Sequence, residues 1–149
     1  MRASDDGASD EGEPVKYMLL MQFNDQVGIP PIDQWTPEEI KAQVGFMHQL
    51  NNSLVEAGEL VDGQGLAMPE AAKIVRAGAG GAPVVTDGPY PETKEWLFGY
   101  WIVDCDTPER VYEIAAYIST APGPGGAPLN MPIEVREVMA GPPEELTTG

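Results

Sequence analysis

Cysteine, histidine and positive charge are all scarce in this chain of 149 residues. Its single cysteine, Cys105, excludes a disulfide within the chain and a zinc site built on cysteines. The neighbouring Asp104 and Asp106 disfavour a thiolate at Cys105, so we do not expect a cysteine nucleophile. Cysteine usage of this kind favours a cytoplasmic protein, and one histidine with one cysteine predicts no metal site.

Only eight lysines and arginines stand against 24 aspartates and glutamates, which gives a net charge of −16. Nucleic acids and anionic membrane surfaces are bound by clustered lysine and arginine, so neither is an expected partner. The chain also lacks an apolar run of the roughly 20 residues that span a bilayer. Its longest run, residues 96–103, has the length of a strand, and the small, acidic start does not resemble a secretory signal.

Cofactor-binding motifs are missing as well. Gly63-Gln64-Gly65 lacks the third glycine and the following helix of a dinucleotide fingerprint. The glycine-rich residues 123–126 are not followed by the lysine and hydroxyl residue of a phosphate-binding loop, and no Gly-x-Ser-x-Gly occurs. We therefore expect no cofactor.

The composition divides the chain into one domain with two tails. Residues 1–13 are small and acidic with no large apolar side chain, which predicts a disordered leader. Residues 141–149 read as a flexible tail, and residues 14–140 form the expected single domain.

The first half of this domain begins with a strand at residues 15–23 that is apolar on both faces. A helix follows from Pro37 to about residue 57, because Thr36 suits the N-cap, Glu39 completes a capping box and Gly58 suits the C-terminal cap. A helical period predicts one buried stripe on this helix, made of Ile40, Val44, Met47, Leu50 and Leu54.

The second half repeats the pattern after a hairpin. The predicted elements are a strand at 60–66, a hairpin of 73–76 with 83–86, a strand at 95–104, a helix at 108–119 and a strand at 133–139. In the second helix Val111, Ile114, Ala115 and Ile118 are expected to face inward. The order β-α-β-(hairpin)-β-α-β predicts an α+β fold, a ferredoxin-like sandwich with two helices on one face of an antiparallel sheet.

The other sheet face is left without cover. Either Trp96, Phe98 and Tyr100 or, alternatively, Leu97 and Trp101 would need burial there. A second copy of the chain is the simplest cover, so we expect a homodimer.

The segment Thr86-Asp87-Gly88-Pro89-Tyr90-Pro91-Glu92-Thr93-Lys94-Glu95 lies between two apolar runs. It resembles the signature of the DGPF-type proteins in the YCII-related family, Asp-Gly-Pro-Phe-Ala-Glu-Thr-Lys-Glu. Tyr90 replaces Phe and Pro91 replaces Ala, while the other seven positions match. The resemblance extends over roughly residues 15–139, and it implies that two sheets pair into a dimeric α/β barrel.

Asp87 in the signature has two interpretations. An aspartate before Gly-Pro commonly bonds nearby backbone N–H groups, which is a structural role, and it can also serve as a general base or polar anchor. Strand alternation places Glu92 and Lys94 on one face. They are either a solvated strand end or substrate contacts, with Lys94 holding an anionic group.

His48 and Asn51 are the candidates on the first helix. His48 is the sole histidine, on the edge of the apolar stripe, and the resemblance implies a His–Asp pair with Asp87, although the family position aligns with Met47. A solvated surface role is the alternative. Asn51 lies in mid-stripe, where it either ties helix to sheet or projects into a pocket between them.

Two functional classes follow. The first is the binding of a small polar or aromatic molecule in a helix–sheet pocket near Asp87, His48 and Asn51, with or without cofactor-independent acid–base chemistry of a lyase or isomerase. The second is a non-catalytic accessory or sensing module. The resemblance implies the latter, with a protein partner in transcription regulation, because relatives often occur alongside extracytoplasmic-function sigma factors.

Overall fold

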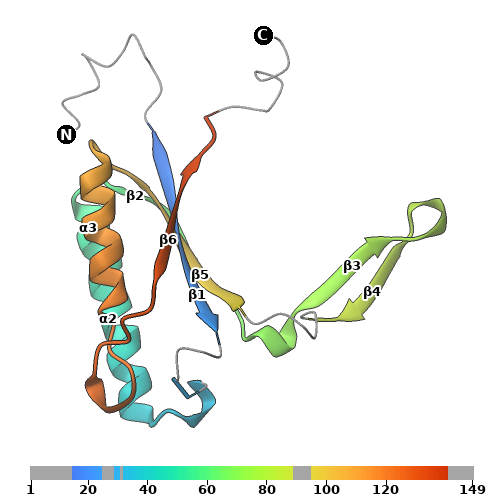
Figure 1. Ribbon diagram of the computed structural model, residues 1–149, viewed down its shortest axis with the longest axis horizontal. Coiled ribbons are helices and arrows are strands. Elements are labelled where there is room, and N and C mark those ends of the chain that lie inside the picture. Colours follow the sequence, from blue (N-terminus) through green and yellow to red (C-terminus); the bar gives the residue numbers. More distant parts are fainter. Residues whose placement is uncertain (1–14, 25–28, 31, 89–94, 141–149) are drawn as a thin grey trace.

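The computed structural model describes residues 15–24, 29–30, 32–88 and 95–140, without the side chains at 23, 24 and 95 (Figure 1). The expected leader, the expected tail and the signature residues Glu92 and Lys94 lie outside the described residues. No α-helix in the described part is long and apolar enough to cross a membrane.

The described elements follow the predicted order, with boundaries that differ by a residue or two. They are β1 (Lys16–Asn24), α2 (Pro37–Glu56), β2 (Leu60–Gly65), β3 (Lys73–Ala77), β4 (Pro83–Asp87), β5 (Glu95–Asp104), α3 (Pro108–Ser119) and β6 (Ile133–Val138). The main sheet has the order β2-β5-β1-β6 with every neighbouring pair antiparallel. Both helices lie on the same side of it (Figure 1). The fold is α+β, consistent with the predicted ferredoxin-like sandwich.

The ends of α2 are fixed by local interactions that the sequence predicted. Glu39 N–H donates to the Thr36 hydroxyl over 3.1 Å, and Thr36 N–H donates to the Glu39 carboxylate over 2.9 Å. Pro37 occupies the first turn, where a missing N–H costs nothing. Gly58, just past the helix, has a φ of 73°, which favours glycine.

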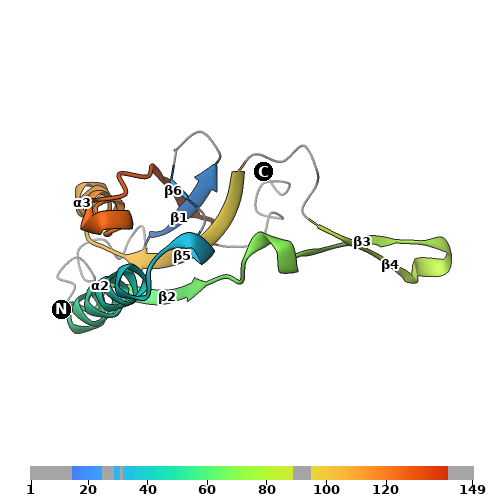
Figure 2. The same ribbon diagram turned by 90° about the horizontal axis from the view of Figure 1, so that it is seen from below.

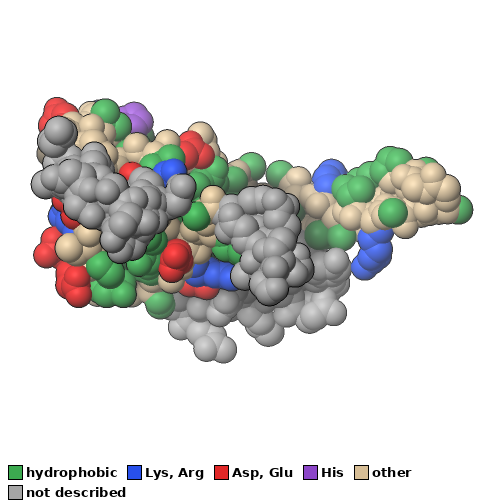
Figure 3. Space-filling model, turned by 90° about the horizontal axis from the view of Figure 1, so that it is seen from above, with side chains coloured by type: hydrophobic (Ala, Val, Ile, Leu, Met, Phe, Trp, Pro, Cys, Tyr) green, Lys and Arg blue, Asp and Glu red, His purple; other side chains and the backbone are tan. Residues whose placement is uncertain are grey.

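Strands β3 and β4 form a separate two-stranded sheet that projects from the body, and we call residues 73–87 the arm (Figures 1 and 2). The predicted hairpin is therefore confirmed. Gly80 and Gly81 in its turn both have positive φ values, 69° and 82°. In the space-filling view hydrophobic and basic side chains are visible on the arm among tan polar and backbone atoms, and acidic side chains are visible on the body (Figure 3).

The core lies between the sheet and the two helices. All four residues predicted to face inward on α3 are buried, namely Val111, Ile114, Ala115 and Ile118. They pack with Leu19 of β1, Val103 of β5 and Leu54 of α2 in one apolar cluster.

The predicted stripe on α2 is only half correct. Leu50 and Leu54 are buried, but Met47 is half-buried and the side chains of Ile40 and Val44 are 36% and 46% exposed. Side chains of the sheet therefore pack only partly against the first half of the stripe. A helical period predicts which residues share a face, but it does not predict how closely that face approaches the sheet.

Two contacts connect the helices to their surroundings. The Arg110 guanidinium on α3 donates to both carboxylate oxygens of Glu59, over 2.9 and 3.0 Å, and these hydrogen bonds raise the pKa of Arg110 above its usual range. The rings of Phe46 on α2 and Tyr117 on α3 stack with centroids 4.9 Å apart. These contacts hold α2, α3 and the start of β2 together.

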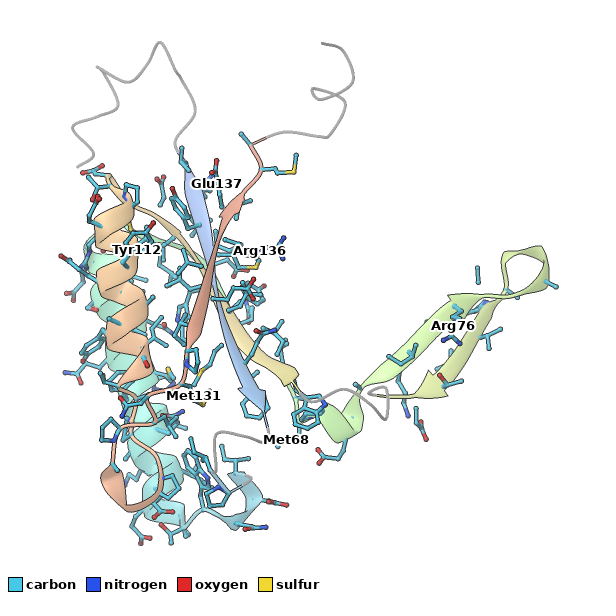
Figure 4. The ribbon with its side chains drawn as sticks, in the orientation of Figure 1. Met68, Arg76, Tyr112, Met131, Arg136 and Glu137 are labelled. Carbon is cyan, nitrogen blue, oxygen red and sulfur yellow. The ribbon has the colours of Figure 1, made fainter. Side chains whose placement is uncertain are left out.

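The sheet face opposite the helices is not covered by any described element. Strand alternation places Leu20 and Met18 of β1 on this face, opposite Tyr100 and Ile102 of β5, and all four side chains are half-buried. Arg136 of β6 points away from the helices on the same side (Figure 4). We call this surface the open face.

Candidate functional site

A cavity of about 430 Å³ opens between the middle of α2 and the β2–β5 half of the sheet. Its lining consists of apolar, aromatic, glycine and carboxamide residues: Met21, Ile32, Gln43, Val44, Met47, Asn51, Gly63, Gln64, Gly65, Leu66, Met68, Phe98, Gly99, Tyr100 and Trp101. Met68 lies where the chain leaves the sheet towards the arm (Figure 4). The half-exposed stripe of α2 therefore forms one wall of this cavity.

Glycines form its floor. Gly63 lies opposite Trp101 and Gly65 lies opposite Gly99 in the β2–β5 ladder, so all three glycines share the helix-facing side with the buried Trp101 ring. A Cβ atom added at Gly65 would have no atom within 4 Å, whereas one at Gly99 would lie 2.9 Å from the Gln64 carbonyl oxygen. The open space therefore lies over Gly65, where no side chain fills it, whereas Gly99 allows the close approach of the β2 backbone.

A β-bulge brings Phe98 to the same cavity. Met21 of β1 lies opposite Gly99, but Gln22 lies opposite Leu97, so Phe98 is an extra residue in β5. Phe98 consequently lines the cavity on the helix side together with Met21. This corrects the sequence expectation, in which strict alternation grouped Phe98 with Tyr100; the bulge reverses the alternation at this point.

Gln43 on α2 lines both this cavity and a smaller hollow of about 40 Å³. The smaller hollow is bounded by a loop whose Trp35 donates its indole N–H to the Pro30 carbonyl over 3.0 Å. The Gln43 Oε1 atom is buried and has no hydrogen-bond partner among the residues that the structure describes. A buried acceptor without a partner is unfavourable for folding, which makes Gln43 unusual among the residues of α2.

Asn51 connects the helix to the sheet. The indole Nε1 of Trp101 donates to Asn51 Oδ1 over 2.9 Å, and both residues line the cavity. The structural tie considered for Asn51 therefore exists, and Asn51 also borders the helix–sheet space.

The cavity lining carries no Asp, Glu, Lys, Arg or His among the described residues. Asp62, next to this lining, accepts hydrogen bonds from Tyr100 over 2.9 Å and from Gln64 over 3.1 Å. The hydrogen bond to Asp62 raises the pKa of Tyr100, because it stabilises the protonated phenol. In addition, no three His, Cys, Asp or Glu side chains gather for a metal ion within the described ranges.

Residues 15–126 match the YCII-related domain, and this match includes every residue that lines the cavity. The chain belongs to the YCII-related family. A similar protein is an uncharacterised protein of Rhizobium meliloti (strain 1021), 33% identical over 87 residues. The aligned region covers 58% of this chain and 69% of that relative.

In this YCII-related chain the two acid–base candidates lie apart from the cavity lining. Asp87 is at the end of β4 on the arm, where its side chain is 88% exposed and accepts from Lys73 Nζ over 2.7 Å. His48 is an exposed residue of α2. Met47, the residue that aligns with the family histidine, does line the cavity, because one residue along a helix turns a side chain by 100°.

The remaining predicted contacts, Glu92 and Lys94, lie outside the described residues. The sequence interpretation missed the cavity residues of β2 and β5, above all Gly63, Gly65 and Phe98. Two glycines spaced by two in a strand share one face, and that spacing was the available signal. The signal for the bulge was Gly99, because a glycine inside a strand often marks a bulge.

Proposed function

We propose that this YCII-related protein binds a small, neutral molecule with an aromatic or apolar body in the cavity between α2 and β5. The observation that carries the proposal is a cavity of about 430 Å³ whose described lining has no charged side chain. This volume falls within the range of about 300–1,000 Å³ that is typical of small-molecule sites. A charged ligand would lose its hydration there without gaining an ionic partner.

The lining also supports the shape of the proposed ligand. Phe98 and Trp101 offer aromatic surfaces, and Met21, Met47 and Met68 offer flexible thioether side chains. Methionine adapts to irregular apolar shapes and makes favourable contacts with aromatic rings. This set of residues suits a flat aromatic molecule better than a polar sugar or a phosphate.

Binding without catalysis is the form of the proposal that we favour. Neither His48 nor Asp87 borders the cavity, so the described lining offers no acid–base pair to a molecule bound there. Such a protein fits the accessory or sensing role that the family resemblance implies. We therefore include three further points in the proposal: the protein acts in the cytoplasm, it has a protein partner, and its role is connected to regulation by extracytoplasmic-function sigma factors.

We further propose that two copies pair through the open face. Its centre is apolar, with Leu20, Met18 and Ile102 half-buried, and polar side chains such as Arg136 and Glu134 surround it. Contiguous apolar surface of this kind usually marks an association site. A two-fold pair would bury the same surface on both copies.

Filling the floor of the cavity tests the ligand-binding proposal. In Gly65→Phe the new ring enters open space, and Gly65 does not have the positive φ that would strain a side chain. Binding of acetophenone is followed through the 13C-labelled methyl groups of Met21, Met47 and Met68. We expect the wild type to show saturable chemical-shift changes with acetophenone, and Gly65→Phe to bind acetophenone at least tenfold more weakly. Benzoate, which is anionic, should cause little change in either protein.

Gly45→Phe is the matched control, because Gly45 lies on α2 outside the cavity lining and also has no atom within 4 Å of an added Cβ. It should bind acetophenone like the wild type. Equal binding by Gly65→Phe, or tighter binding of benzoate than of acetophenone, would contradict the proposal.

A further inference from the structure

The side-chain amide of Asn51 is held in one orientation at the wall of the cavity. Trp101 Nε1 donates to Asn51 Oδ1 over 2.9 Å, from β5 to α2. An indole N–H can only donate, so it selects the amide oxygen and directs the amide nitrogen to the other side. The packing of α2 on the sheet thereby determines which atom of the Asn51 amide can bond to another molecule.

The available end is a hydrogen-bond donor. Asn51 Nδ2 has no hydrogen-bond partner among the described residues, and it is not one of their buried unpartnered atoms. Asn51 lines the cavity, so a bound molecule would lie beside this amide group. A positioned amide donor of this kind is completed by an acceptor on a bound molecule.

The other two carboxamides of the lining are engaged differently. Gln64 Nε2 donates to Asp62 over 3.1 Å, and the Gln43 oxygen is buried. Asn51 differs from both, because Trp101 binds its oxygen and thereby fixes the direction of its free amide nitrogen. It lies beside Met47 and Trp101, so the donor stands next to the apolar surface that would hold a ring.

From this geometry we infer that Asn51 donates a hydrogen bond to a carbonyl oxygen of the ligand, and that the ligand is a neutral aromatic carbonyl compound. This inference rests on the proposed binding in the cavity and adds the chemical class of the ligand. A molecule of the same shape that lacks an acceptor would displace water from the Asn51 N–H groups. It would leave these groups without a hydrogen bond. Sites with positioned hydrogen-bonding groups discriminate against such analogues for this reason.

The test compares acetophenone with α-methylstyrene, which has the same shape but carries a C=CH2 group in place of C=O. Titrations follow the labelled methionine methyl groups of the cavity, with Met139 as an exposed reference. We expect the wild type to bind acetophenone about fivefold more tightly, a factor in the range of one neutral hydrogen bond. In Asn51→Asp the carboxylate still accepts from Trp101 but no longer donates, so the preference should disappear.

Two further variants separate this role from a general effect on folding. Asn51→Leu removes the donor without adding charge and should bind both probes equally. Asn52→Asp makes the same substitution as Asn51→Asp at the next residue, which is exposed and outside the cavity lining, and should keep the fivefold preference.

The outcomes distinguish this inference from the proposed function. Equal binding of both probes by the wild type, or a preference that persists in Asn51→Asp and Asn51→Leu, would overturn the role of Asn51 while binding in the cavity stands. If neither probe shifts the cavity methionines, the proposed function and the inference both fail.

Discussion

Gln43 carries a polar atom where the fold gives it no partner. Its Oε1 is buried at the wall shared by the cavity and the smaller hollow, and no hydrogen bond from the described part of the chain compensates for the lost water. Leaving a buried acceptor unpaired costs about 1–3 kcal/mol. A residue that lowers stability at the edge of a cavity is typical of sites shaped by binding, where groups are arranged for a ligand rather than for folding.

Gln43→Met should therefore stabilise the protein. Methionine has a similar length and no strongly polar atom, so we expect the free energy of unfolding to rise by about 1 kcal/mol. Urea denaturation at neutral pH measures this change. Gln49→Met on the same helix is the control, because Gln49 is exposed and should change stability by less than about 0.5 kcal/mol. A loss of stability in Gln43→Met would contradict the account of Gln43.

At the scale of the element, the start of α2 depends on one carboxylate. Glu39 Oε1 accepts from Thr36 N–H within the capping box, and Oε2 accepts from Gly125 N–H over 2.7 Å. Gly125 belongs to the loop between α3 and β6, so Glu39 joins two distant segments. The Gly125 N–H, followed by that of Thr36, lowers the pKa of Glu39 because both stabilise its charged form.

The lowered pKa gives a direction for the dependence of stability on pH. A carboxyl whose pKa is lower in the folded state stabilises the fold above its unfolded value of about 4.3 and loses this contribution as pH falls further. We expect wild type to be more stable than Glu39→Gln at pH 7, and the difference to shrink below about pH 5.

Urea denaturation at several pH values measures this difference. Glu38→Gln serves as the control, because no described hydrogen bond involves the exposed Glu38 side chain. A constant difference between wild type and Glu39→Gln from pH 7 to pH 3 would show that the Glu39 charge does not contribute.

At the scale of the whole molecule, the sheet has one face packed by helices and one open face. Leu20 lies at the centre of the open face, opposite Tyr100 on one side and Glu134 on the other. In a homodimer paired through this face Leu20 would be fully buried. An aspartate there would bring two charges per dimer into an apolar interface, next to Glu134 of the same sheet.

We therefore expect light scattering at micromolar concentration to give about twice the chain mass of 16.0 kDa for wild type and a value near 16.0 kDa for Leu20→Asp. Val55→Asp is the control, since Val55 is 61% exposed on the outer surface of α2, and it should stay dimeric. Circular dichroism checks that each variant is folded. A monomeric wild type would contradict the proposed pairing.

Local signals explain why so much of the fold could be predicted. Thr36 caps α2, and Thr107 caps α3 by accepting from Arg110 N–H over 3.2 Å. Like these caps, the glycines of the arm turn and the inward residues of α3 act within a few positions along the chain. Their effects do not depend on distant parts of the chain. The element order follows from them, and the order of elements indicates the sandwich.

The candidate site was harder to predict because its parts meet only through tertiary packing. Asn51 was identified from its place in an apolar stripe, but its partner Trp101 is 50 residues away. His48 and Asp87 were paired by resemblance, whereas the structure places Asp87 with Lys73 on the arm. Gly99, a glycine inside an apolar strand run, is a weak sequence signal for the bulge that turns Phe98 towards α2, but it does not give the direction of the Phe98 side chain.

The elements, their order and the membership of the YCII-related family all follow from the amino-acid sequence, without knowledge of the tertiary structure. Tertiary packing places the middle of α2 over the glycines of β2 and β5, where the cavity opens, and it brings Trp101 to the Asn51 oxygen. The physical reason is the range of the interactions. Caps, turns and periodicity depend on neighbouring residues, whereas a cavity is the space that several distant segments together leave unfilled.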